Sequence, residues 1–141
     1  MGSALARKLG VGADDRVYLA HAPAAVRDAL ALPPARVAAR LTGEFAHLHV
    51  FVDDADALAA AFARLKPHLA PRGRLWVSWR KGAPKGEGLR LTEIIRVGYD
   101  HGLVESKTVS VDDTWSAIKF THPRPGVRYR NSYGRLPGQE P

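Results

Sequence analysis

Positive charge and glycine gather in one short stretch of the sequence, RKGAPKGEG, at residues 80–88. A glycine-rich loop exposes backbone N–H groups, and the amino terminus of a following helix favours negative charge. Arg80, Lys81 and Lys85 would add side-chain charge to such a site. The stretch is not a Walker A loop, because Lys85 precedes its glycine and no hydroxyl residue follows to reach magnesium. It predicts either an anion-binding loop or a flexible, solvated connection.

Histidines supply the other candidate groups for chemistry. His21 follows the first expected strand, where an imidazole can act as general acid or base, and we include it among the anion-binding candidates. No acidic or nucleophilic neighbour in the sequence orients it. His47 and His49 flank Leu48, and the period of two places both imidazoles on one face of a strand. Zinc sites usually need three or four fixed protein ligands, so we predict no metal site.

Other residue patterns favour structure over catalysis. Asp112, Asp113 and Thr114 suit a hairpin turn better than a carboxylate site, because Asp side chains bond their own backbone. Cysteine is absent, which excludes disulfides, cysteine nucleophiles and thiolate metal sites. No GxSxG nucleophile elbow is present either. We therefore assign no catalytic and no cofactor-binding residues.

The location of the charge is more informative than its amount. The chain has 141 residues and a net charge of +7. Residues 72–90 contain six basic groups and one acid, residues 123–141 contain four arginines and one acid, and the remainder has a net charge of −1. Charge clustered in this way attracts anions or nucleic acid, although a solvated loop and a loose tail have the same composition. No apolar run reaches the length that spans a bilayer, so we expect a soluble, cytoplasmic protein without membrane contact.

Alternating strand-type and helix-type segments must position these residues. An apolar stripe of Leu58, Phe62, Leu65 and Leu69, preceded by Asp53 and Asp54 as possible caps, predicts the clearest helix. Two other helices are expected, one from Pro23 to about Leu30 and one from a Thr92 cap to about His101. The expected strands are Arg16–Ala20, Val37–Leu41, His47–Val52, Leu75–Trp79, Val104–Val111 and Ala117–His122.

Strands and helices in alternation predict a parallel sheet with helices on both faces. The last two strands add an antiparallel hairpin. The prediction is a small, doubly wound, Rossmann-like α/β domain over residues 1–122, followed by a basic, Pro/Gly-rich tail over residues 123–141 that is extended or disordered. In such sheets the ligand crevice lies outside the carboxyl ends of the strands, where residues 20–23, 52–54 and 79–88 are expected.

The segment LKPHLAPRGRLWVSW, the helix expected after Thr92 and the closing hairpin resemble the later part of class I AdoMet-dependent methyltransferases. The resemblance covers about residues 15–122 and implies a shortened form of that fold. Members of that family have a glycine-rich turn after their first strand and an acidic residue after their second. Here the first turn reads LAHAPAAV, without glycine, and Glu44 is the nearest acid to the second position.

The stretches KLGVGADDRVYLAHAP, RLWVSWRKG and LTEIIRVGYDHGLVESKTVSVDDTWSAIKF resemble a family of short bacterial proteins of unknown function. This resemblance extends to residue 122 and supports the fold without implying catalytic residues.

Taken together, these patterns predict a non-catalytic binding module for a nucleotide, a nucleic acid or an acidic protein. The first alternative is a degenerate AdoMet-dependent methyltransferase or another nucleotide-using transferase. The second is a structural partner subunit.

Overall fold

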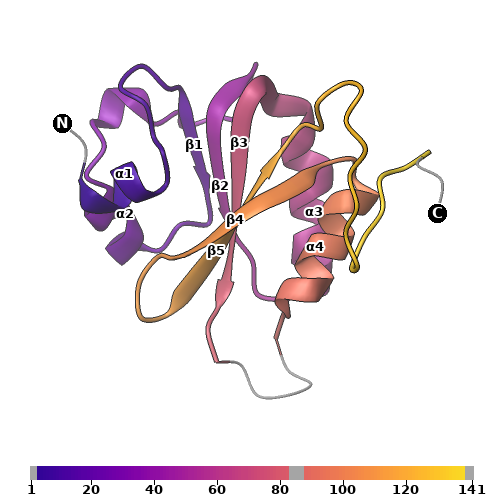
Figure 1. Ribbon diagram of the computed structural model, residues 1–141. Helices are drawn as coiled ribbons and strands as arrows, with labels where there is room; N and C mark the ends of the chain where they lie inside the picture. The colour runs from indigo at the N-terminus through magenta and orange to yellow at the C-terminus, as the bar shows by residue number, and fades with distance from the viewer. Residues whose placement is uncertain (1–2, 83–87, 139–141) are drawn as a thin grey trace.

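The chain folds around one five-stranded sheet in the order β1-β2-β3-β5-β4 (Figure 1). The computed structural model describes residues 3–82 and 88–138. Strands β1 to β3 pair in parallel, whereas β3–β5 and β4–β5 are antiparallel pairs. The predicted fold class, a small Rossmann-like α/β sheet with a closing antiparallel hairpin, is confirmed. The strands are β1 (Val17–Ala20), β2 (Phe45–Phe51), β3 (Leu69–Arg80), β4 (Val104–Ser110) and β5 (Trp115–Thr121).

Helices cover both faces of this sheet, as Figure 1 shows. One apolar core lies beneath α3 and α4, and a second lies beneath α1 and α2. Within the described part of the chain, no helix is long and apolar enough to cross a membrane. The helices are α1 (Ala4–Lys8), α2 (Ala24–Leu30), α3 (Ala55–Leu65) and α4 (Leu91–Asp100), and two short 3-10 turns span Pro34–Arg36 and Lys66–His68.

Local sequence signals explain α3 well and α4 less well. Leu58, Phe62 and Leu65 are buried along one side of α3, as their spacing predicts, whereas Leu69, expected on the same stripe, lies outside the helix as the first residue of β3. The Asp54 carboxylate caps this helix by accepting a hydrogen bond of 2.8 Å from a backbone N–H of its first turn. The expected Thr92 cap is wrong, because α4 begins one residue earlier and Arg90, at its N-cap, makes no side-chain cap bond.

The segment expected as a second strand contributes a single bridge instead. Val37 pairs in parallel with Val17 on one side of β1, while His47 of β2 pairs with Val17 on the other side. From β1 the chain therefore passes through α2 to one flank of β1 and then crosses to the opposite flank. Such a reversal of direction defines the switch point of a doubly wound sheet, where ligands commonly bind.

The third strand is longer than the expected Leu75–Trp79, because Pro71–Gly73 also lies inside it. Gly73 allows this close pairing, since a Cβ there would come within 2.8 Å of the carbonyl oxygen of Phe45. Trp76 and Trp79 point to opposite faces of the strand, as expected from their spacing. Trp76 is buried, and Trp79 is partly buried against the core beneath α3 and α4.

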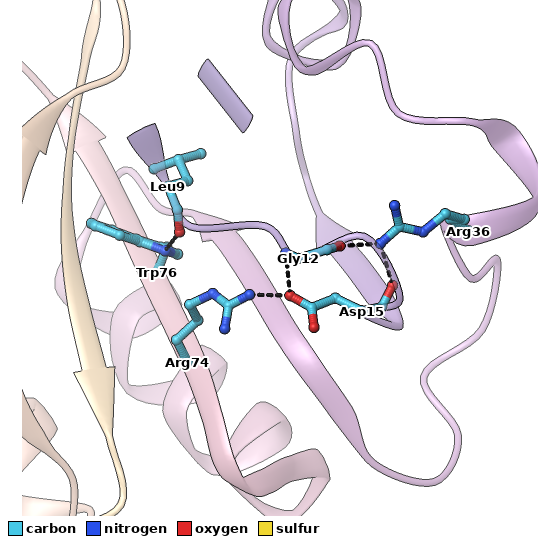
Figure 2. A network of polar contacts seen from close by, with 6 residues as sticks. All are labelled: Leu9, Gly12, Asp15, Arg36, Arg74 and Trp76. Atoms are coloured by element: carbon cyan, nitrogen blue, oxygen red, sulfur yellow. Dashed lines mark hydrogen bonds and ion pairs between the residues drawn. The ribbon is translucent and has the colours of Figure 1, made fainter. Parts of the chain in front are cut away.

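An N-terminal strap, residues 3–15, is fastened across the α1/α2 face by polar contacts (Figure 2). The indole of Trp76 donates a 2.9 Å hydrogen bond to the carbonyl of Leu9. The Asp15 carboxylate pairs with the guanidinium of Arg74 and accepts the Gly12 backbone N–H at 2.6 Å. Arg36 donates to two carbonyls of the strap. The strap thus covers an apolar face that its five-residue helix could not cover alone.

The Asp15–Arg74 pair is expected to stabilise the fold measurably, because both side chains are about four-fifths buried. Asp15→Asn should lower the free energy of unfolding by about 1–3 kcal/mol, since it leaves a mostly buried guanidinium without its carboxylate. Asp100→Asn is the matched control. Its pair with Arg96 is more than half exposed, and we expect a loss below about 0.5 kcal/mol. Equal losses in urea titrations would contradict a structural role for the strap.

Candidate functional site

A small cavity lies at the switch point, between the carboxyl ends of β1 and β2 and the side of α3. Its volume is about 140 Å³. An apolar cavity of roughly 150 Å³ accommodates one benzene-sized ring. Its lining residues are Ala20, His21, Val50, Phe51, Val52, Ala57, Ala60, Ala61, Arg64 and Leu65.

The cavity exists because α3 presents small side chains to it. Ala57, Ala60 and Ala61 occupy one side of the helix, since positions three and four apart are neighbours on a helix surface. On the sheet side, Ala20 is the register partner of Val50, so small and medium side chains meet there as well. The crevice at residues 20–23 and 52–54 was predicted from the sequence, but the contribution of α3 was not, although the run ADALAAAFA between apolar anchors was the available signal.

His21 lies at the mouth of this cavity in an unusual backbone conformation. Its φ is +60°, in the left-handed region that L-residues other than glycine seldom adopt. The turn after β1 therefore contains a residue in a conformation typical of glycine even though it lacks glycine itself. Strained residues of this kind cluster at ligand sites. The structure places this candidate at the predicted crevice.

Arg64 forms the cationic part of the rim. Its guanidinium donates a 3.2 Å hydrogen bond to the hydroxyl of Tyr18, and its Cζ lies 6.0 Å from the centroid of the Tyr18 ring. A neutral hydroxyl leaves the positive charge of the guanidinium in place. The site therefore combines an apolar slot for a ring with a cation at its edge.

Arg80 is not part of this cavity. Its guanidinium forms a 2.6 Å ion pair with Asp53 and lies 4.5 Å above the ring of Trp115, a residue of the core beneath α1 and α2. The cavity instead opens on the side of the sheet covered by α3. His21 and Arg80 thus lie at the same edge of the sheet but toward opposite faces, and Asp53 balances the charge of Arg80.

Lys81 has a different neighbour. Its ammonium donates to the hydroxyl of Ser110, whose backbone carbonyl accepts a 2.6 Å hydrogen bond from Lys8. Two ammonium groups thus meet at the end of β4, and the strap supplies one of them. Lys85, the third basic candidate of the loop, lies outside the described residues.

His47 and His49 share one face of β2, as predicted, and both are fully buried under the strap. His49 has Ser78 as its hydrogen-bond partner at 2.7 Å and stacks on Phe51. Neither ring nitrogen of His47 is hydrogen-bonded to a described residue. No cluster of three potential metal ligands occurs in the described part of the chain.

Burial determines how these histidines titrate. Desolvation lowers the pKa of His47 well below 6.5, and the nearby charges of His49 and Arg74 lower it further. Desolvation alone lowers the pKa of His49 to about 3. Both imidazoles are therefore neutral in the folded protein at neutral pH, and their role is to fill the core beneath the strap.

The Asp112 carboxylate of the hairpin acts as the turn interpretation predicts. Asp112 accepts hydrogen bonds from the backbone N–H groups of Thr114 and Trp115 at 2.9 and 2.8 Å. This is the local bonding that makes Asp frequent in turns.

Larger hollows in the described part of the chain lie away from the switch point. One of about 570 Å³ borders the outer edge of β1, and two of about 730 and 720 Å³ border the amino ends of the parallel strands, near Pro71 and Pro123. Ligands of doubly wound sheets bind at the carboxyl ends, so topology favours the smaller cavity over these hollows.

Comparison with known proteins supports the fold alone. No family model matches the sequence, so the resemblance to short bacterial proteins stays a prediction, and no curated protein matches either. LepI in complex with SAM is a similar solved structure, 13% identical, covering 84% of this chain and 39% of that chain, with a TM-score of 0.50. The N-methyltransferase NodS from Bradyrhizobium japonicum WM9, in complex with S-adenosyl-L-homocysteine, is 18% identical and covers 77% of this chain and 66% of that chain, with a TM-score of 0.48. This chain therefore spans less than two thirds of either protein.

A whole AdoMet molecule does not fit the site. Pockets for ligands of that class usually exceed about 300 Å³, and the cavity measures about 140 Å³. The turn after β1 places His21, Ala22 and Pro23 where the methyltransferase pattern has glycines. Glu44 precedes β2 and so lies at the amino end of the sheet, opposite the crevice. No methyl-transfer step follows from these residues.

The buried histidines predict how stability depends on pH. The unfolded chain protonates them near pH 6.5, and the folded chain does so only at much lower pH. Above pH 6.5 these histidines therefore do not reduce the free energy of unfolding. That free energy falls as the pH drops below 6.5. The loss should approach about 1.4 kcal/mol per pH unit for each histidine.

His47→Leu should reduce that slope between pH 6 and 5 without loss of stability at pH 7.5, because it replaces a buried ring that lacks a partner. Urea titrations at each pH measure both quantities. If the free energy of unfolding of His47→Leu had the same pH slope as that of the wild type, His47 would not be a source of the pH dependence.

Proposed function

We propose that this chain is a degenerate domain of the methyltransferase type that binds a small, ring-bearing anion such as a mononucleotide without transferring a methyl group, with only the ring inside the cavity and the phosphate outside it at Arg64. The left-handed backbone of His21 at the mouth of the switch-point cavity is the observation that carries this proposal. The left-handed backbone of His21 costs conformational energy, which the rest of the fold must offset. Ligand binding at the crevice gives a reason for retaining this strained residue.

The chemistry of the cavity favours this ligand class over a purely apolar one. A base ring suits a slot lined by alanine and valine side chains in both size and polarity. Arg64 at the rim can meet a phosphate, because a guanidinium binds phosphate oxygens with two parallel hydrogen bonds. LepI, whose structure holds SAM, is similar to this chain in fold alone.

A thermal-shift series with AMP, GMP, CMP, UMP and AdoMet tests the proposal, because a ligand of the folded state raises the unfolding temperature by mass action. We expect at least one mononucleotide to stabilise the protein. Ala60→Phe should abolish that shift, because its ring fills the cavity. Ala59→Phe is the matched control, since it is exposed on the same helix and does not line the cavity.

A series in which no mononucleotide shifts the unfolding temperature would refute the proposal. Stabilisation by AdoMet that Ala60→Phe removes would instead show that the crevice opens to accept the whole cofactor.

The strain at His21 gives an independent prediction. His21→Gly should raise the free energy of unfolding by up to about 1 kcal/mol, because glycine adopts positive φ without the Cβ clash. It should also weaken mononucleotide binding. Ala31→Gly is the control, because Ala31 has a φ of +51° at the end of α2, away from the cavity. That variant should gain stability and keep its affinity in calorimetric titrations. Unchanged affinity in His21→Gly would remove His21 from the site.

A further inference from the structure

Residues 131–134 of the tail form a tight turn that is fastened to α4 and β4. Asn131 bridges to Gly134, and its side-chain oxygen accepts a 2.8 Å hydrogen bond from the backbone N–H of Tyr133. Its side-chain nitrogen donates to the carboxylate of Glu105 at 2.8 Å. The same carboxylate oxygen accepts a hydrogen bond from the buried Tyr99 hydroxyl at 3.1 Å. One acid on β4 thus connects the tail to the core.

Gly134 brings the turn into direct contact with α4. A Cβ at this position would come within 2.9 Å of the Cβ of Tyr99 and 3.2 Å of the Cα of Arg96. Real Cβ atoms essentially never approach other atoms as closely as the first distance. Figure 1 shows the tail running beside this helix. The turn is therefore held at both ends, by a shared carboxylate and by a close approach of backbone to helix.

This fastened turn presents an aromatic ring to solvent between two arginines. Tyr133 is 53% exposed, the highest value among the large apolar and aromatic side chains described. Arg130 and Arg135 on either side are also exposed. Neither arginine forms an ion pair with a described residue. Residues 123–138 contain four arginines and no acidic residue.

We propose that this turn is a binding surface for single-stranded nucleic acid, in which Tyr133 stacks on a base while Arg130 and Arg135 contact the flanking phosphates. Proteins that bind single strands combine these two elements, an aromatic platform and cations that follow the backbone. The surface is independent of the switch-point cavity, because it lies on α4 and β4.

The exposed ring favours single-stranded nucleic acid over two other anionic partners, an acidic polypeptide and a nucleic-acid duplex. An acidic polypeptide would use the arginines but would leave the tyrosine without an aromatic counterpart. In a duplex the bases are stacked on one another, so an exposed ring finds no free base face. Only an unpaired strand provides a phosphate and an open base at adjacent positions.

Fluorescence anisotropy with a labelled 12-nucleotide oligo(U) and the full chain tests the proposal, at 50 to 200 mM salt. Affinity should fall with salt as counterions are released. Tyr133→Ala should weaken binding by about 5- to 140-fold, the effect of losing one stacked base. Arg130→Gln combined with Arg135→Gln should reduce the salt slope by about 1.4, or about 0.7 for each phosphate contact on a single strand.

Two control variants distinguish a specific binding surface from non-specific electrostatic attraction. Arg40→Gln combined with Arg72→Gln removes the same charge from exposed positions elsewhere and should leave the slope unchanged. Asn131→Ala keeps every charge and releases the turn from Glu105, so it should weaken binding without altering the slope. Tyr133 is exposed, and its variant should unfold at the wild-type temperature.

Three results would each overturn the proposal. The first is no binding of the oligonucleotide at 50 mM salt. The second is wild-type affinity in Tyr133→Ala. The third is displacement of the oligonucleotide by polyglutamate at the concentration where unlabelled oligo(U) displaces it, which would identify an acidic polypeptide as the partner.

Discussion

The burial of β2 on both faces is the constraint from which the rest of the structure follows. A parallel strand between two others must be covered by helices on each side. One face of β2 carries Leu48 and Val50 and is covered by α3 and α4. The other carries His47 and His49, which the short strap and α2 must cover. Because α1 has only five residues, polar contacts from Asp15 complete that cover, and the histidines beneath it stay neutral.

The crevice at the end of β1 follows from the same arrangement. β1 has partners on both sides, so the chain changes direction there and leaves space between the strand ends and α3. Larger side chains on α3 would close that space, and its alanines leave it open. His21 holds the turn above it in a conformation that glycine would adopt at lower cost. Two independent features, small residues and backbone strain, thus converge on one site of about 140 Å³.

Periodic apolar patterns predicted the layers from sequence, whereas features that depend on distant partners could not be predicted. The stripe from Leu58 to Leu65 and the Asp54 cap are local signals, and they defined α3 correctly. Val37 looked like a strand because its segment is β-prone, yet a single bridge forms there. Arg80 looked like an available cation, because the sequence cannot show that Asp53, 27 positions earlier, lies 2.6 Å away. The strap helix escaped notice because five residues carry no period.

The two basic segments, residues 72–90 and 123–141, show that the net charge of a segment does not measure the charge that a ligand can reach. At the end of β3 the Asp53 carboxylate pairs with Arg80, and in the loop that follows a serine hydroxyl accepts a hydrogen bond from Lys81, so both of these cations have partners within the fold. Beside the tail, the Glu105 carboxylate is bonded to Tyr99 and Asn131, and Arg130 and Arg135 are exposed without an ion pair to a described residue. Burial and the Glu105 charge raise the pKa of Tyr99 to about 12, so its hydroxyl remains a donor to that carboxylate throughout the physiological range. Among the described residues of these two segments, Arg130 and Arg135 thus combine exposed charge with an exposed ring between them, and an anionic partner follows exposure and geometry before charge number.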